Sequence, residues 1–293
     1  MAKVLNFGSL NIDYVYQVEH ILQPGETLSS KGMAVFCGGK GLNQSIALAK
    51  AEVIPYHAGA IGEDGTLLMD FLKDNGVNVD YLEQIEGKSG HTIIQVDSQA
   101  QNCILVHPGT NRCQKKDHID QVLTQFGEGD YILLQNEINE LDYIINKAYA
   151  RGMKIILNPS PIDSNLLETN LEKVSIFIMN ELEGEALTGF LTPQDILFDM
   201  QRRFPGSKVM LTMGDKGAYY AEEDNVYFQD IFPVKPVDTT AAGDTFTGYF
   251  VAGLVQNTPI KDNLRCSAKA ASITVSREGA AQSIPTISEV LKG

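Results

Sequence analysis

The chain has 293 residues, of which 43% are hydrophobic and 20% charged, a composition that allows one large or two ordinary globular domains and excludes wholesale disorder. Its 37 Asp and Glu residues outnumber its 23 Lys and Arg residues, which gives a formal net charge of −14. A surface this acidic repels polyphosphate backbones and anionic lipid, so we expect neither a nucleic acid nor a membrane as partner.

The N-terminal part of the chain predicts a strand and, further on, a glycine-rich turn into a helix. The segment KVLNF (3–7) is typical of a buried strand that ends at the turn Gly8-Ser9. Residues 38–41 (GGKG) precede a segment in which Leu42 and Ile46 recur at helical spacing. We therefore expect a helix to begin directly after this glycine-rich turn.

Two regions of β-hairpin character, 14–36 and 91–107, interrupt the order of strands and helices. Apolar and polar residues alternate in them, as in strands with one covered and one exposed face. We expect a small accessory sheet rather than strands of the core. The expected strands are 14–18, 28–35, 91–97 and 102–107, with the turn of the second hairpin at 98–100.

Short apolar strands alternate with helices through the rest of the chain. The expected strands are 55–61, 131–135, 154–158, 176–179 and 209–212. The expected helices are 65–75, 139–151, 193–203, 244–256 and 260–276. Strands this apolar, interleaved with helices, predict an α/β fold with a parallel sheet covered on both faces. Because no linker-like segment occurs, we expect a single α/β domain over 1–293 with a β appendage.

The cysteines and the N-terminus indicate the compartment. Neither CxxC nor zinc-finger spacing occurs among the four cysteines, which is typical of reduced thiols. These are Cys37, Cys103, Cys113 and Cys266. No apolar run reaches the roughly 18 residues that span a bilayer, and the first residues lack a signal-peptide pattern. We therefore expect a soluble, cytoplasmic protein.

Small polar and acidic residues follow the predicted strands. In open α/β sheets, ligands bind beyond the carboxyl ends of the strands. Each residue taken singly is also typical of a cap or a turn, but their common edge favours a site. The residues in question include Asn11, Asp13, Glu137, Asn180, Glu183, Thr212, Gly214 and Gly217.

The strongest local signal is the segment DTTAAGDTF (238–246), which precedes an apolar helix. Small residues let successive backbone N–H groups converge, and a helix N-terminus adds about half a positive charge. The segment therefore predicts an anion-binding cup with Asp244 in the first helical turn. Ala-Gly-Asp alone is also typical of a simple turn, whereas the whole run is more specific.

Other phosphate and metal motifs are absent from the sequence. Neither GxxxxGK[ST] nor a GxGxxG after the first strand occurs, which argues against a P-loop nucleotidase and a nicotinamide-dependent dehydrogenase. The five histidines are scattered and no HExxH occurs, so we expect no transition metal held by protein ligands.

Five motifs of the chain resemble the ribokinase branch of the PfkB carbohydrate kinases, in the family's order. They are GSLNID near the start, GGKGLNQ at 38–44, MNELE at 179–183, TMGDKG at 212–217 and DTTAAGD at 238–244. The segment 276–283 is also similar to the family's monovalent-cation loop. The resemblance spans 8–283 and implies a ribokinase-like three-layer sandwich, with a mostly parallel central sheet flanked by helices and a β-sheet lid formed by 14–36 and 91–107.

The resemblance also implies an activity, ATP-dependent phosphorylation of a sugar hydroxymethyl group, and a role for each matching residue. Asp244 would be the catalytic base beside an amide cup of Ala241, Ala242 and Gly243. The sugar would contact Asn11, Asp13, Gly39, Lys40, Asn43, Glu137 and Asp244. Asn180 and Glu183 would organise Mg²⁺, Glu183 through water, and the nucleotide would contact Thr212, Gly214 and Gly217. A K⁺-type site would use Asp238, Thr240, Thr274, Arg277, Gly279 and Ser283.

Three residues depart from the resembled pattern. Tyr249 replaces a small residue, which predicts looser or shifted helix packing. Lys269 lies on the helix that would flank the adenine, and we expect it to point to solvent. Thr240 replaces an apolar residue, and a contribution through its carbonyl group would survive that change.

Ribose is the expected substrate, because GGKGxN together with NxD resembles ribokinases more than nucleoside kinases. Deoxyribose, fructose or a nucleoside are the alternatives; a nucleoside base would need a slot such as Tyr14, Tyr16 and Phe36 offer. A catalytically silent sugar-binding or regulatory protein is the alternative from another class, against which an intact Asp244 argues. Family likeness further implies a homodimer formed through the lid. The sequence leaves the substrate, the oligomeric state and the strength of the cation dependence open.

Overall fold

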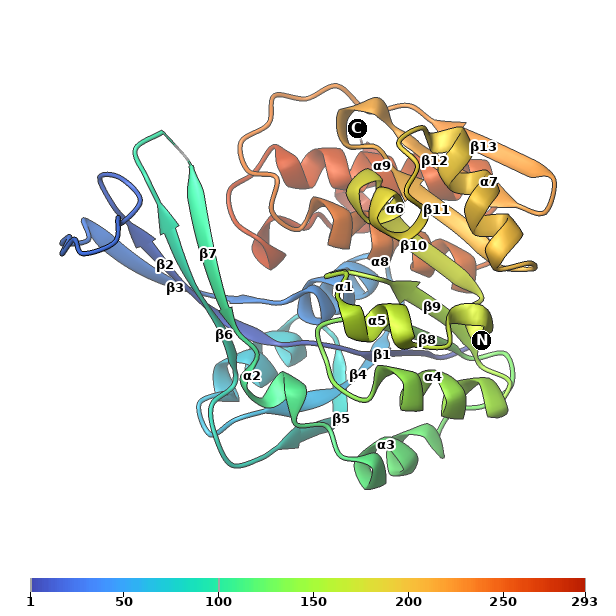
Figure 1. Ribbon diagram of the computed structural model, residues 1–293, viewed down its shortest axis with the longest axis horizontal. Helices are drawn as coiled ribbons and strands as arrows, with labels where there is room; N and C mark the ends of the chain where they lie inside the picture. Colours follow the sequence, from blue (N-terminus) through green and yellow to red (C-terminus); the bar gives the residue numbers. More distant parts are fainter. Residues whose placement is uncertain (1, 100, 293) are drawn as a thin grey trace.

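The computed structural model describes residues 2–99 and 101–292, so part of the turn expected at 98–100 lies outside the described residues. The described strands form one nine-stranded sheet and one four-stranded sheet. In Figure 1 the smaller sheet extends to one side of the larger, helix-covered sheet. The α/β fold with an accessory sheet is therefore confirmed.

The large sheet has the strand order β13-β12-β11-β10-β9-β8-β1-β4-β5. All neighbouring pairs from β11 to β5 are parallel, and β12 and β13 add to the edge in antiparallel orientation. The sheet is therefore mostly parallel, as expected. The strands are β1 (Val4–Phe7), β4 (Pro55–Ile61), β5 (Asn78–Gln84), β8 (Tyr131–Gln135), β9 (Lys154–Asn158), β10 (Ile176–Asn180), β11 (Lys208–Thr212), β12 (Ala218–Glu222) and β13 (Asn225–Gln229).

Helices cover both faces of the large sheet, and a separate cluster of buried apolar side chains lies on each face. One face carries α1 (Lys40–Lys50), α2 (Thr66–Asp74), α8 (Ala242–Val255), α9 (Ile260–Val275) and α10 (Ile287–Lys292). The other carries α3 (Lys116–Leu123), α4 (Leu141–Ala150), α5 (Ser164–Glu168), α6 (Glu181–Thr188) and α7 (Pro193–Arg203). This is a three-layer sandwich. Among the described residues, no helix combines the length and the apolar character needed to cross a bilayer.

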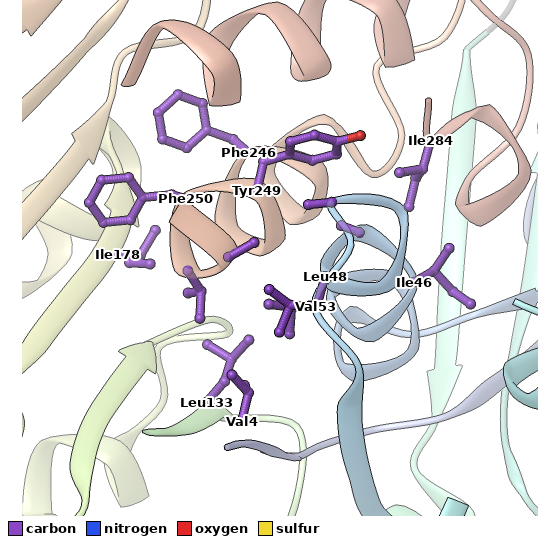
Figure 2. Close-up of a cluster of buried hydrophobic side chains, with 14 of the residues drawn as sticks. Val4, Ile46, Leu48, Val53, Leu133, Ile178, Phe246, Tyr249, Phe250 and Ile284 are labelled. Carbon is purple, nitrogen blue, oxygen red and sulfur yellow. The ribbon is translucent and has the colours of Figure 1, made fainter. Parts of the chain in front are cut away.

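The packing of α8 against α1 positions the site. Figure 2 shows Phe246, Tyr249 and Phe250 of α8 in the same buried cluster as Ile46 and Leu48 of α1. Four of these five side chains are apolar throughout, and full burial of each stabilises the fold by about 1.5–3 kcal/mol. Because the two helices share this cluster, their N-terminal turns are held at a fixed separation.

Tyr249 does not loosen the packing of α8, so the expectation drawn from its size is wrong. Its side chain is 2% exposed. Its hydroxyl group donates a 2.7 Å hydrogen bond to the Pro285 carbonyl oxygen. The ring therefore fills the core, and its polar end is satisfied by the chain that precedes α10.

The four-stranded sheet, hereafter the lid, has the order β3-β2-β6-β7. Each hairpin is antiparallel, and β2 and β6 join the two hairpins as a parallel pair. The strands are β2 (Asn11–Gln17), β3 (Gly32–Gly38), β6 (Gly90–Val96) and β7 (Asn102–His107). The strand expected at 28–35 is displaced, because its partner β2 spans 11–17 and pairs Gln17 with Gly32 and Asn11 with Gly38.

Candidate active site

Asp244 lies in the first turn of α8 beside the predicted amide cup. Its side chain is 9% exposed. Ala241, the residue before the helix, has a left-handed φ of 60°, which turns the chain into α8. Backbone N–H groups in a first helical turn have no intrahelical acceptor, so those of Gly243 and Asp244 are available to an anion. The Ala242 N–H instead donates a long 3.3 Å hydrogen bond to the Thr239 carbonyl.

A cavity of about 350 Å³ opens beside the cup. It brings Ala242 and Gly243 together with all three residues predicted to contact the nucleotide, Thr212, Gly214 and Gly217. Apolar side chains form much of the remaining wall, which suits a planar aromatic base. These include Ile231, Phe232, Val234, Pro236, Phe246, Ala268, Ala271 and Val275.

Lys269 contributes to this cavity wall indirectly. Its Nζ atom lies 5.8 Å from the centre of the Phe232 ring, which is within the range of a cation–π contact. Phe232 itself lines the cavity. The ammonium group therefore lies over an aromatic ring of the cavity, and the exposure of the Lys269 side chain to solvent stays a prediction.

Two amide side chains of α1 hold the Asp244 carboxylate. Asn43 Nδ2 donates a 2.9 Å hydrogen bond to Oδ2, and Gln44 Nε2 donates one of 2.9 Å to Oδ1. Asn43 Oδ1 is buried and has no hydrogen-bond partner among the described residues, which is uncommon for a buried polar atom. The assignment of roles from the sequence missed Gln44, although it ends the quoted GGKGLNQ motif.

Lys40 lies at the start of α1 and carries a positive charge into a cluster of carboxylates. Burial lowers the pKa of Lys40, but attraction to Asp244, Glu137 and Glu183 outweighs it and leaves the pKa above its ordinary value. Gly39 precedes it with a φ of 94°, a conformation that favours glycine and leads β3 into α1. Lys40 is therefore a cation that three carboxylates share.

Glu137 connects the end of β8 to this region. Its Oε2 atom accepts hydrogen bonds from the Ser9 hydroxyl and, at 3.1 Å, from the Lys40 backbone N–H. Burial raises the pKa of Glu137, and the nearby charge of Lys40 opposes that effect without cancelling it. Ser9, which follows β1, was missed as a direct partner of this carboxylate.

Asn11 and Asp13 enter the same region from β2 of the lid. Burial raises the pKa of Asp13 to about 6, against a 2.6 Å hydrogen bond from the Thr92 hydroxyl that favours the ionised form. Asn11 Oδ1 accepts a 2.8 Å hydrogen bond from Asn111 Nδ2. Thr92 and Asn111 thus hold Asp13 and Asn11, the two lid residues predicted to contact the sugar. No motif in the sequence indicated Thr92 or Asn111.

Asn180 and Glu183 form a capping box at the N-terminus of α6. Asn180 Oδ1 accepts from the Glu183 N–H at 2.8 Å, and Glu183 Oε2 accepts from the Asn180 N–H at 2.9 Å. One side-chain oxygen of each residue thus has a structural task. Glu183 Oε1 remains for a hydrated cation, and carboxylate oxygen is a ligand type that suits Mg²⁺.

Asp238 joins two segments predicted to form the monovalent-cation site. Its Oδ1 atom accepts from the Thr240 N–H at 2.9 Å and from the Thr240 hydroxyl at 2.6 Å. Its Oδ2 atom accepts from the Gly279 N–H at 3.0 Å. The Asp238 carboxylate therefore links Thr240, in the segment before α8, to Gly279, in the segment after α9. These two segments carry the residues predicted to bind the cation.

The other three residues predicted for this site have defined partners. The Thr274 hydroxyl pairs with that of Thr245 at 3.0 Å, and the Ser283 hydroxyl donates to the Ala280 carbonyl at 2.6 Å. The Arg277 guanidinium pairs with Glu289 at 2.7 Å. Any contribution of Arg277 to a cation site would therefore come from its main chain.

Comparison with known proteins identifies relatives over the whole chain. The chain matches the pfkB family carbohydrate kinases over residues 1–287. It is 34% identical over 301 aligned positions to a ribokinase from Staphylococcus aureus, with 98% of each chain covered. The structure is similar to a ribokinase from Thermotoga maritima, with a TM-score of 0.89, 32% identity and full coverage of both chains. It is equally similar, at 0.89 and 31% identity, to an Arabidopsis thaliana ribokinase complexed with ribose and ATP, covering 100% of this chain and 98% of that one.

This protein therefore belongs to the pfkB family of carbohydrate kinases.

Proposed function

We propose that this protein transfers the γ-phosphoryl group of ATP to the hydroxymethyl group of ribose, giving ribose 5-phosphate and ADP. One observation carries the proposal: Asp244 and the cup residues share the N-terminus of α8, which borders the 350 Å³ cavity, while Asn43 and Lys40 of α1 face the same carboxylate. Because the reaction consumes ATP, we expect it to take place in the cytoplasm.

Asp244 acts as the general base in this proposal. A sugar hydroxyl is a weak nucleophile, and a carboxylate within hydrogen-bond reach takes its proton as the new O–P bond forms. Each carboxylate oxygen accepts one hydrogen bond from α1 and keeps lone-pair capacity for that proton. The two amide donors also fix the direction in which the carboxylate faces.

The first-turn amides of α8 and the Lys40 ammonium group stabilise the charge on the transferring phosphoryl group. Catalysis of phosphoryl transfer is mostly positioning and electrostatic stabilisation. The N–H groups are fixed by the helix, so they need no reorganisation during the reaction. Lys40 is partly buried near three carboxylates, and a phosphoryl group entering there would add a further anionic partner.

Two cations complete the proposal. Glu183, through the oxygen that does not take part in the capping box, would hold Mg²⁺ by way of water, and the ion would supply positive charge against that of the leaving group. For K⁺, the support is the contact that Asp238 makes with both segments of the predicted site. Asp238 thereby couples the segment 276–283 to the turn that forms the amide cup.

Asn11, Asp13, Asn43 and Glu137 orient the sugar, since carboxylate and amide groups bind vicinal hydroxyls. Asn43 Oδ1, buried without a partner among the described residues, is one acceptor for such a hydroxyl.

A coupled ADP-release assay across pentoses, hexoses and nucleosides tests the proposal. We expect the highest kcat/KM with ribose. A higher value for deoxyribose, fructose or a nucleoside would replace ribose with that substrate, and no ADP release with any of them would favour the catalytically silent sugar-binding protein. Direct sugar binding by calorimetry separates that last outcome from an inactive preparation.

We further propose a homodimer formed through the lid. Several large apolar side chains on the lid are exposed, a pattern that marks interaction surfaces. They are Met33, Val35, Ile93, Ile104, Leu105 and Val106. Light scattering should give twice the chain mass, and a lid variant such as Leu105→Lys should shift the population to monomer. The wild-type monomer mass at working concentration would contradict the proposal.

A further inference from the structure

A network of buried amide side chains lies beneath Asp244. Gln44 is fully buried, and its Nε2 atom donates to Asp244 Oδ1 at 2.9 Å and to Asn158 Oδ1 at 3.2 Å. Its Oε1 atom accepts a 2.7 Å hydrogen bond from Gln135 Nε2. Gln135 Nε2 also donates to Asn6 Oδ1 at 3.0 Å. The network thus joins β1, β8, β9 and α1 to the first turn of α8.

Backbone carbonyl groups at both ends of the network determine the direction of every amide. Asn6 Nδ2 donates to the Gly41 carbonyl at 2.7 Å, which leaves Asn6 Oδ1 to face Gln135 as an acceptor. Asn158 Nδ2 donates to the Ile178 carbonyl at 3.0 Å, which leaves Asn158 Oδ1 to face Gln44. A carbonyl oxygen only accepts, so neither terminal amide can be reversed without losing its backbone partner.

The direction of the terminal amides is transmitted to Gln44. Gln135 faces two acceptors and must present its NH₂ group to both, and its own Oε1 is left buried without a partner among the described residues. The NH₂ group of Gln135 therefore donates to Gln44, and the Gln44 oxygen must point toward it. Its NH₂ group is thereby directed at Asp244. A reversed Gln44 would place its oxygen against the carboxylate and against Asn158 Oδ1.

We propose that Gln44 is a positioning residue for the general base: the buried network Asn6–Gln135–Gln44–Asn158 holds an N–H donor against Asp244 Oδ1 and fixes the carboxylate for proton abstraction. The inference rests on the proposed function, because it presupposes that Asp244 takes the proton. Gln44 acts through Asp244 and is not among the residues that line the cavity. A hydrogen bond to a carboxylate favours its charged form, which is the form that serves as a base.

Gln44→Met tests the role, because methionine keeps the length of the side chain and removes its amide. We expect kcat to fall roughly 10–100-fold, the usual weight of a hydrogen bond to a charged group, with the KM for ATP unchanged within about 2-fold.

Gln256→Met is the matched control. Gln256 caps the opposite end of α8, where its Nε2 atom donates to the Ala51 carbonyl at 3.0 Å. The substitution removes a glutamine hydrogen bond from the same helix without touching the network. We expect kcat of this variant to equal that of the wild type.

A double-mutant cycle with Asp244→Asn separates positioning from a merely structural role. Once the base is removed, Gln44→Met should lower the residual kcat by less than about 2-fold, because the two residues act as one unit. Should Gln44→Met not fold, as judged by thermal unfolding, Gln44→Glu takes its place; it keeps the shape and sets a carboxyl group against Asp244.

The outcomes distinguish the two proposals. Loss of activity in Asp244→Asn with an unchanged kcat in Gln44→Met would overturn the positioning role alone. An equal loss of kcat from Gln44→Met in both backgrounds would also overturn it, since a structural defect is independent of the base. Near-normal turnover of Asp244→Asn would instead overturn the proposed function.

Discussion

Asn43 Nδ2 and Asp244 Oδ2 are joined by a 2.9 Å hydrogen bond across 201 positions of sequence. Asn43 was expected to bind the sugar. In the structure its NH₂ group holds the proposed base, while its buried oxygen has no partner among the described residues. The α1–α8 contact makes this arrangement possible.

Asp244→Asn should lower kcat roughly 10²–10⁴-fold, the usual share of a general base, because the amide cannot take the hydroxyl proton. Nucleotide binding, measured by calorimetry, should stay close to the wild-type value, since the cup and cavity are unchanged. Single-turnover kinetics on the variant would reveal whether chemistry is the slowed step. Near-normal turnover would remove Asp244 from its role.

Asp13 should make sugar binding dependent on pH. Its folded-state pKa of about 6 lies above its ordinary value, so the carboxylate that accepts sugar hydroxyls forms only as pH rises through about 6. We expect the KM for the sugar to fall between pH 5 and pH 7, with little change in the KM for ATP. Asp13→Asn is the control and should abolish this pH dependence while raising the KM for the sugar.

The same pKa carries a consequence for stability with a definite sign. A carboxyl pKa that is higher in the folded than in the unfolded state means that ionisation of Asp13 opposes folding. This destabilisation is absent below about pH 4, grows as pH rises, and is complete above about pH 6. Asp13→Asn should therefore be more stable than the wild type at pH 7, by up to about 2–3 kcal/mol, and the gain should shrink at pH 4. Urea unfolding at both pH values measures it; an equal difference at both would contradict the prediction.

His57 should weaken the fold in acid. Complete burial lowers its pKa to about 4, so the folded protein keeps the ring neutral while the unfolded chain binds a proton below about pH 6.5. Stability from this residue is present above pH 6.5 and declines by up to about 3 kcal/mol as pH falls to 4. His57→Asn should be less stable at pH 7 but show a flatter decline of stability in acid, which acid unfolding of the two proteins measures.

Gly41→Ala should displace the first turn of α1, which carries Lys40 and Asn43 of the site. A Cβ at Gly41 would lie 2.6 Å from the Gly8 carbonyl carbon, so the first turn of α1 must move away from β1. We expect a loss of about 1–3 kcal/mol in the free energy of unfolding, as for overpacking, together with a fall in kcat/KM because Lys40 and Asn43 move with the turn. Gly127→Ala, whose Cβ would meet no atom within 4 Å, is the control and should match the wild type.

K⁺ should activate the enzyme more than Na⁺. Asp238 ties the two segments of the predicted cation site to each other, and a bound cation would reinforce the turn that leads into the amide cup. Asp238→Ala should lower kcat and remove the difference between the two salts. Initial rates at equal ionic strength in KCl and NaCl provide the measurement; equal wild-type rates would discard the cation site.

Much of the fold was predictable because it depends on local patterns. Apolar runs such as 131–135 and 154–158 formed the buried parallel strands β8 and β9, and helical periodicity placed α8 and α9 within two residues of their bounds. By contrast, β5, β12 and β13 were missed. They lie toward the two ends of the large sheet. The partly exposed strands β5 and β13 carry polar residues and lose the continuous apolar signal, whereas β12 is mostly buried and this reason does not apply to it.

The sequence by itself determined which residue types follow the strands and precede α8. Such turns and helix starts depend on residues only a few positions apart in the chain. Only the tertiary structure decided how they pair. Gln44, Thr92 and Asn111 resemble ordinary polar residues in the sequence, and their tasks arise because packing brings them against Asp244, Asp13 and Asn11. A hydrogen bond is sensitive to tenths of an ångström and to direction, and for residues far apart in the chain both are fixed by the way the helices and sheets pack.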